Sequence, residues 1–161
     1  MRMSSILSGQ RAGMVRTERA MRSATTNNHL AAFNRQVMEW QEAAYTLAYY
    51  LTGNEAQAEE TVQGAVLQAY QKSGANPNGG RAALLQAVIG TCRKLHHAAH
   101  ANGKDGLAGI LSNLSPERRC AVLLVDVLGL SYEEAAQVLS SSPARVSEWL
   151  AQGRVAVMVG A

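Results

Sequence analysis

The chain has 161 residues, with 15 lysine and arginine side chains against 12 aspartate and glutamate side chains, a net charge of +3. Only three prolines and one phenylalanine occur, which suits an all-helical protein of one domain or two small domains. The longest apolar run, residues 121–125, is too short to span a bilayer, and no secretory signal pattern is present. We therefore expect a cytoplasmic protein without membrane insertion. Cys92 and Cys120 lie in helical patterns, which favours reduced core thiols over a disulfide.

The charge is unevenly distributed along the chain. Residues 1–28 contain five arginines and one glutamate, a net charge of +4, whereas the remainder has ten basic and eleven acidic side chains, a net charge of −1. Residues 1–28 also lack apolar periodicity, so we expect a disordered basic arm. This arm is either a solvated tail or a segment that binds acidic partners or DNA. The remainder should bind free DNA weakly, because such binding depends on phosphate neutralisation.

A first helical bundle is predicted over residues 29–100. Apolar residues recur at steps of three and four from Phe33 to Leu51, which predicts one long helix ended by Gly53. Asn54 can cap a second helix over about 55–72, and a third is expected over about 81–100 after a turn-rich break. Glycine and polar residues over 101–112 predict a flexible linker.

A second bundle, residues 113–161, is predicted from helix start and stop signals. Ser115 and Pro116 open one helix, which ends at Gly129. Ser131 and Glu134 form a capping box for the next helix. A last helix begins at the pair Ser142-Pro143. Three short helices punctuated in this way are typical of a helix-turn-helix.

Polar residues dominate the outward side of the last helix. Val146 and Leu150, four residues apart, predict its inward stripe. The other side carries Arg145, Ser147, Glu148, Gln152 and Arg154. A recognition helix meets the major groove of DNA with such a face.

The segment from about 111 to 157 resembles the C-terminal, promoter-reading domain of bacterial sigma factors, especially the extracytoplasmic-function (ECF) group. The matching positions are Leu114, Ser115, Pro116, Arg119, Val122, Leu124, Asp126, Val127 and residues 129–136. Residues 45–70 resemble the polymerase-binding helices of the same family, in the right order and at the right separation. The chain thus resembles an all-α ECF sigma factor with two small helical bundles joined by a flexible linker.

The resemblance implies core RNA polymerase and promoter DNA as partners, with an anti-sigma factor as a further partner. It implies that Glu60, Gln63 and Leu67 face polymerase. Arg93 and Lys94 would lie along the melted strand. The residues implied for the distal promoter element are Arg145, Ser147, Gln152 and Arg154.

Several departures from the family pattern favour a second hypothesis. The expected melting helix has no aromatic ring besides histidine, so it lacks stacking platforms for single-stranded DNA. Glu148 would repel phosphate, and Ser140 stands at a turn position that is normally glycine. The alternative is a sigma-like regulator or decoy that binds an anti-sigma factor or polymerase without melting DNA.

Metal and enzyme functions are weaker interpretations. Cys92, His96 and His100 share one helical face, but three ligands on one helix cannot complete a tetrahedral site. No nucleophile triad, glycine-rich phosphate loop or carboxylate pair indicates catalysis. We therefore expect no enzyme activity, metal or cofactor.

Overall fold

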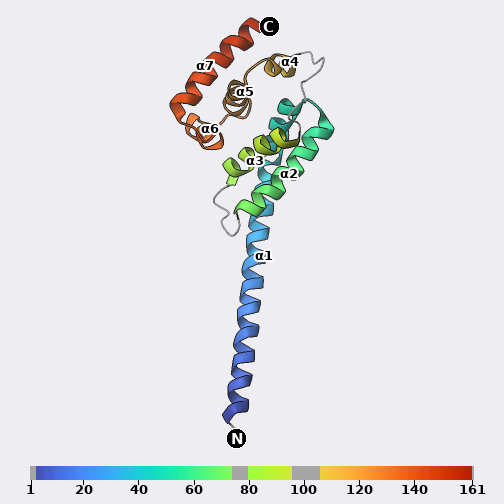
Figure 1. Cartoon of the computed structure of the whole chain (residues 1–161), viewed down its shortest axis with the longest axis vertical. Coiled ribbons are helices and arrows are strands. Elements are labelled where there is room, and N and C mark those ends of the chain that lie inside the picture. The colour runs from blue at the N-terminus through green and yellow to red at the C-terminus, as the bar shows by residue number, and fades with distance from the viewer. Residues whose placement is uncertain (1–2, 74–79, 96–105, 161) are drawn as a thin grey trace.

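The computed structural model describes residues 3–73, 80–95 and 106–160, with side chains described for residues 13–72, 80–95 and 106–160. These ranges are helical and contain no strand, which confirms the predicted all-α fold class. The elements are α1 (Met3–Thr52), α2 (Glu55–Ser73), α3 (Gly80–Leu95), α4 (Leu107–Ser112), α5 (Pro116–Val122), the π-helical segment η2 (Leu123–Val127), α6 (Tyr132–Val138) and α7 (Pro143–Gly160). Figure 1 shows two groups of helices at one end of a very long α1.

The first group consists of the C-terminal part of α1 with α2 and α3. Gly53 ends α1 as predicted, with a φ of 65° that favours glycine. The Oδ1 atom of Asn54 accepts a hydrogen bond from the amide of Gln57 at 3.1 Å, so the predicted cap of α2 is confirmed. The buried core of this group comprises Ala44, Leu47, Ala48, Ala58, Ala65, Ala69, Leu84, Leu85 and Val88.

Gly64 lies where α2 crosses α3. A Cβ atom at this position would lie 2.9 Å from Cγ2 of Thr91, closer than real Cβ contacts. A glycine in mid-helix costs about 1 kcal/mol relative to alanine. The close approach of the two helices supplies the packing reason for this glycine.

The second group consists of α4 to α7. Helix α5 continues into η2, where the amide of Leu128 donates to the carbonyl of Leu123 at 2.9 Å, an i to i−5 bond. The guanidinium of Arg119 donates to the carbonyls of Leu111 at 2.8 Å and Ser112 at 2.9 Å. Arg119, part of the sigma-like motif, thus satisfies carbonyls at the end of α4 and has a structural role.

The two groups contact each other through α3 and α6 and through α1 with α4 and η2. Nε2 of Gln86 donates to Oγ of Ser140 at 2.8 Å, and Nη2 of Arg81 donates to the carbonyl of Leu128 at 3.4 Å. The linker expected over 101–112 lies partly outside the described residues, and its last part forms α4. The division of the chain into four segments at the predicted boundaries stays a prediction.

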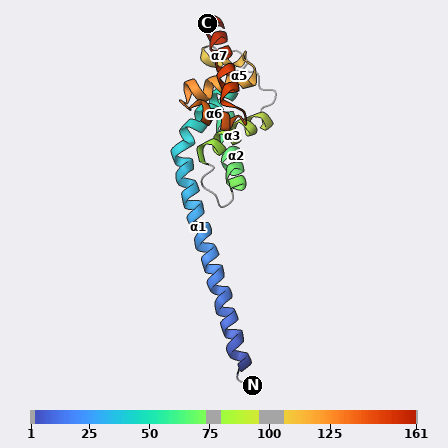
Figure 2. The same ribbon diagram turned by 90° about the vertical axis from the view of Figure 1, so that its left-hand side faces the viewer.

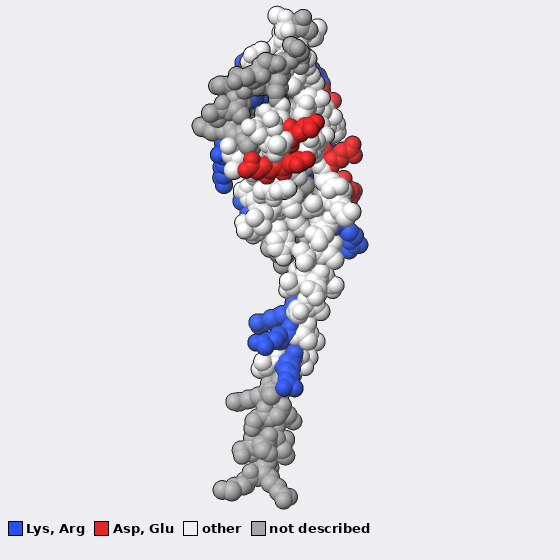
Figure 3. Space-filling model, turned by 90° about the vertical axis from the view of Figure 1, so that its right-hand side faces the viewer, with Lys and Arg blue, Asp and Glu red and all other residues white. Residues whose placement is uncertain are grey.

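The expected disordered arm, residues 1–28, differs from the structure. Helix α1 is continuous from Met3, and its N-terminal half projects away from the other helices in both views (Figures 1 and 2). All side chains from Gly13 to Asn28 are exposed. Helix extension adds one hydrogen bond per residue once a nucleus exists, and the packed part of α1 supplies that nucleus. Figure 3 shows basic side chains on this projecting part of α1, whereas the acidic side chains on the same face lie over the two groups of helices.

None of the helices in the described residues combines the length and apolarity needed to cross a membrane. Within the same ranges, no group of three histidine, cysteine or acidic residues could hold a metal ion. His96 and His100, the other members of the weighed metal set, lie outside the described residues.

Candidate nucleic-acid interface

Helices α6 and α7 begin at the caps that the sequence predicts. Oγ of Ser131 accepts from the amide of Glu134 at 3.1 Å, and the Glu134 carboxylate accepts from the amide of Ser131 at 2.9 Å. This reciprocal pair is the predicted capping box. Helix α7 starts at Pro143, where Oγ of Ser142 accepts from the amide of Arg145 at 3.3 Å. The helix-turn-helix is therefore formed as expected.

The turn between α6 and α7 contains a serine in the left-handed region. Ser140 has a φ of 51° and is the one non-glycine residue with positive φ in the described ranges. This conformation costs a residue with a Cβ atom about 1 kcal/mol of conformational free energy, which explains why glycine would suit the position. The Ser140 hydroxyl accepts the hydrogen bond from Gln86 of α3. Glycine at this position would lose that contact with the other bundle.

Helix α7 presents polar side chains to solvent in its first turns, where Val146 and Leu150 point inward. Val146 and Leu150 are buried, as their spacing predicts, while Arg145, Ser147 and Glu148 are exposed. A Cβ atom on Gly153 would lie 2.6 Å from Cγ2 of Val122, so α7 and α5 cross very closely here. The close crossing fixes which side of α7 faces solvent.

Two of the predicted DNA-binding side chains on α7 have partners within the protein. Arg154 pairs with Asp126 of η2: Nη2 lies 2.6 Å from Oδ1, and Nε lies 3.0 Å from Oδ2. This hydrogen bonding raises the pKa of Arg154 above its ordinary value. Gln152 accepts from Nε of Arg118 at 2.9 Å and donates to Glu148 at 3.4 Å. Sequence spacing could not show these pairings, because Asp126 and Arg118 lie 28 and 34 residues away.

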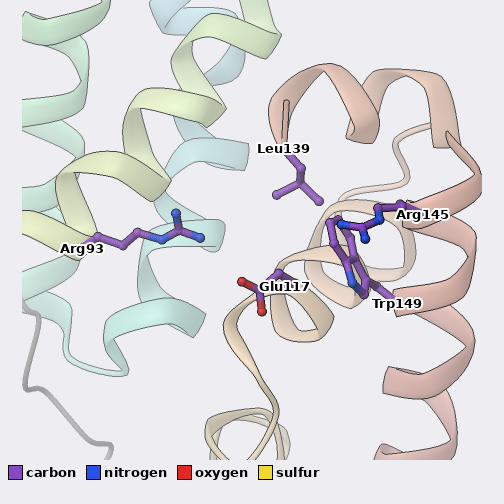
Figure 4. A pocket seen from close by; sticks show the side chains of 5 residues that line it. All are labelled: Arg93, Glu117, Leu139, Arg145 and Trp149. Carbon is purple, nitrogen blue, oxygen red and sulfur yellow. The ribbon is translucent and has the colours of Figure 1, made fainter. Parts of the chain in front are cut away.

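A hollow of about 470 Å³ lies between α3 and the helix-turn-helix. It is lined by Arg93, Glu117, Leu139, Arg145 and Trp149 (Figure 4). The Arg93 side chain extends from α3 toward Glu117, and the Arg145 guanidinium carbon lies 5.8 Å from the centre of the Trp149 ring. This distance fits a cation–π contact. The structure thus brings together Arg93 and Arg145, which the resemblance assigns to different stretches of DNA.

Lys94 is exposed at the end of α3 and is not among the residues that line the hollow. It follows Arg93 directly, so the two basic groups extend from adjacent positions near the C-terminus of the helix. Trp149 also lines the hollow, although the sequence did not assign it to a site. Its spacing of four residues from Arg145, which places both side chains on one side of the helix, is the sequence signal that could have identified it.

The predicted polymerase-binding residues lie together on α2. Glu60, Gln63 and Leu67 are all exposed, and their spacing of three and four residues places them along one side of the helix. Leu67, a large apolar side chain, is 59% exposed. This side lies opposite the small buried residues Ala58, Ala65 and Ala69. Its assignment to polymerase stays a prediction.

The two cysteines have free thiols, as the sequence predicts. Cys120 is buried and Cys92 is partly buried. Burial raises the pKa of Cys120 to about 11 and also raises that of Cys92. These thiols are therefore protonated near neutral pH and poorly suited to nucleophilic chemistry.

The class of domain is now defined by sequence comparison as well as geometry. Residues 105–157 match the family model for sigma-70, region 4. This range includes α4 to α6 and most of α7, with the helix-turn-helix described above. Residues 105–157 are thus similar to sigma-70 region 4, and the resemblance seen in the sequence is confirmed over this range.

One solved structure that the chain resembles is that of CnrH in complex with the cytosolic domain of CnrY. The TM-score is 0.71 at 22% sequence identity, and the match covers 85% of this chain and 92% of CnrH. At this identity the likeness establishes the shared all-helical fold across both bundles. A search of curated protein sequences gives no significant match.

Proposed function

We propose that this protein is an ECF-type sigma factor that binds core RNA polymerase and directs it to promoter DNA in the cytoplasm. The observation that carries the proposal is the sigma-70 region 4 domain with its intact helix-turn-helix and exposed Arg145 and Ser147. A recognition helix contacts base edges through residues near its N-terminus. Arg145 is the third residue of α7 and fits that role.

The exposed side of α2 supports the second half of the proposal. Glu60, Gln63 and Leu67 lie on the first bundle, away from the recognition helix in the sequence, so one molecule can offer separate surfaces to polymerase and DNA. The exposed Leu67 offers this otherwise polar side an apolar group that a partner protein could bury. Leu67→Asp should abolish co-purification with core polymerase and leave the fold intact, because the side chain is exposed.

The test is reconstitution with core RNA polymerase and run-off transcription from the fragment upstream of the protein's own gene. Arg145→Gln should reduce promoter-specific transcript by about tenfold, because a good base contact is worth about 1–3 kcal/mol. Arg35→Gln is the matched control, since Arg35 is an exposed arginine on α1 outside both predicted surfaces. Unchanged transcription by the Arg145 variant would remove that residue from promoter recognition.

A second candidate function is favoured by the pairing on α7. Arg154 is held by Asp126, Gln152 is held by Arg118, and Glu148 adds a negative charge to the same helix. These features weaken a phosphate-binding surface and suit a sigma-like regulator or decoy. CnrH, which has the same fold, was solved with a bound protein domain. A stable polymerase complex without transcript would favour the regulator, and tight binding to an anti-sigma protein without a polymerase complex would favour the decoy.

A further inference from the structure

The N-terminal half of α1 forms an exposed shaft, which we define as residues 13–28. Every side chain in it is exposed, and both ribbon views show it projecting clear of the body (Figures 1 and 2). The hydroxyls of Thr17, Thr25 and Thr26 bond to carbonyls of their own helix, four residues back. Nothing else in the described residues covers this segment.

The shaft carries a basic row. Arg16, Arg19 and Arg22 follow at steps of three, so each is turned about 60° from the last and the row spans about 9 Å along the axis. Glu18 is the single acidic residue of the shaft. Within the described residues, none of the three guanidinium groups has an ion-pair partner.

The shaft has no apolar stripe. Its large apolar residues, Met14, Val15 and Met21, are each at least 60% exposed and are mixed with arginine, threonine and asparagine. A helix that lies in a membrane surface or in an apolar groove needs one continuous apolar side. Charge is therefore the property through which this segment can recognise a partner.

The charge of the rest of the molecule makes the shaft important for DNA. Residues after 28 have a net charge of −1, whereas residues 1–28 have +4, of which the shaft contributes +2 through three arginines and one glutamate. Sequence-independent affinity for DNA comes from phosphate neutralisation with release of counterions. Arginine suits phosphate particularly well because its planar guanidinium can donate two parallel hydrogen bonds.

We propose that the shaft is a DNA-phosphate-binding arm, in which Arg16, Arg19 and Arg22 contact the backbone of double-stranded DNA outside the sequence-reading surface. This deepens the proposed function, because it supplies the electrostatic affinity that the near-neutral body lacks. Since the contacts are to phosphate, they add affinity for any duplex and carry no base preference.

The test is the salt dependence of binding between the full chain and a labelled duplex of random sequence, measured by fluorescence anisotropy without polymerase. The slope of log K against log salt should become shallower by about 1.8 in Arg16→Gln/Arg19→Gln, and by about 2.7 when Arg22→Gln is added. Glutamine retains helix propensity, and circular dichroism checks that α1 is intact.

The matched control is Arg35→Gln/Lys72→Gln, which removes two exposed positive charges from outside the shaft. Its slope should stay close to that of the unmodified chain. An equal change in both double variants would overturn the proposal, because net charge alone would then explain the binding. Absence of duplex binding at low salt, or self-association that depends on these arginines, would also overturn it.

These outcomes are separate from failure of the proposed sigma activity. Polymerase-dependent transcription that needs Arg145 can persist while the shaft variants bind random duplex normally. Conversely, the shaft can bind duplex in a protein that never yields a transcript. The two assays therefore test the two proposals independently.

Discussion

The side chain of Arg154 shows how a residue with a predicted binding role can have a second role within the fold. Its guanidinium meets both carboxylate oxygens of Asp126, although the two side chains remain 50% and 32% exposed. Most exposed ion pairs contribute little to stability, and a bidentate arginine–carboxylate pair is the geometry best able to contribute. The pair also orients Arg154 and links α7 to η2. A DNA contact by Arg154 stays a prediction, and it would require phosphate to compete with Asp126.

Cys120 gives a prediction at the same scale. Burial raises the pKa of its thiol to about 11 from an ordinary value near 9, so the unfolded chain loses this proton at lower pH than the folded protein. The folded state then binds more protons, and its free energy of unfolding should fall between these pH values. The maximum slope is about 1.4 kcal/mol per pH unit.

Urea unfolding across this pH range checks that expectation. Cys120→Ala is the comparison, because the variant should be less stable at neutral pH but should lack this part of the alkaline loss. Parallel pH profiles for the two proteins would contradict the assignment to Cys120.

At the scale of whole helices, close crossings decide which glycines can be replaced. Gly64 and Gly153 each lie against a neighbouring helix. A Cβ atom at either position would fit only if the neighbouring atoms moved. Gly90 is also in a helix, but a Cβ atom there meets nothing within 4 Å. Helix propensity alone would treat the three positions alike.

Gly153→Ala should therefore lower the free energy of unfolding by about 2 kcal/mol, because the new methyl group overlaps Val122 and approaches the carbonyl of Arg118. Gly90→Ala should raise the free energy of unfolding by up to about 1 kcal/mol through helix propensity. Urea titration of both variants measures the difference. Stabilisation by both substitutions would show that α5 and α7 can separate at little cost.

At the scale of the molecule, the two bundles touch through a sparse junction. Two hollows, of about 470 and 300 Å³, lie where α1 and α3 face the second bundle. Nε of Arg81, at this junction, is buried without a hydrogen-bond partner among the described residues. Inter-domain contacts of this polar kind permit relative motion. The junction is therefore compatible with a change in the relative orientation of the two bundles.

The shaft of α1 should be independent of the stability of both bundles. Deleting residues 1–28 should shift the melting temperature of the remainder by less than about 2 °C, because the described side chains of this segment pack against nothing. The helical circular dichroism signal per molecule should fall. A large loss of melting temperature would mean that the arm contacts the body in solution.

Much of the fold followed from local sequence signals. Gly53, Gly129, the Ser131–Glu134 capping box and Ser142-Pro143 set helix ends by backbone geometry and short-range hydrogen bonds, which depend on a few neighbouring residues. Apolar spacing likewise predicted the buried sides of α1 and α7, and the motif around Arg119 predicted the match of residues 105–157 to sigma-70 region 4. These signals could be interpreted without knowing how the helices pack.

The tertiary structure decided what depends on residues distant in sequence. It paired Arg154 with Asp126, placed Arg93 on the same hollow as the Arg145–Trp149 pair, and explained Gly64 and Gly153 by helix crossings. It also extended α1 through the segment expected to be disordered. Local patterns fix where a helix begins and which side is apolar, but contacts across helices depend on relative positions that no short stretch of sequence contains.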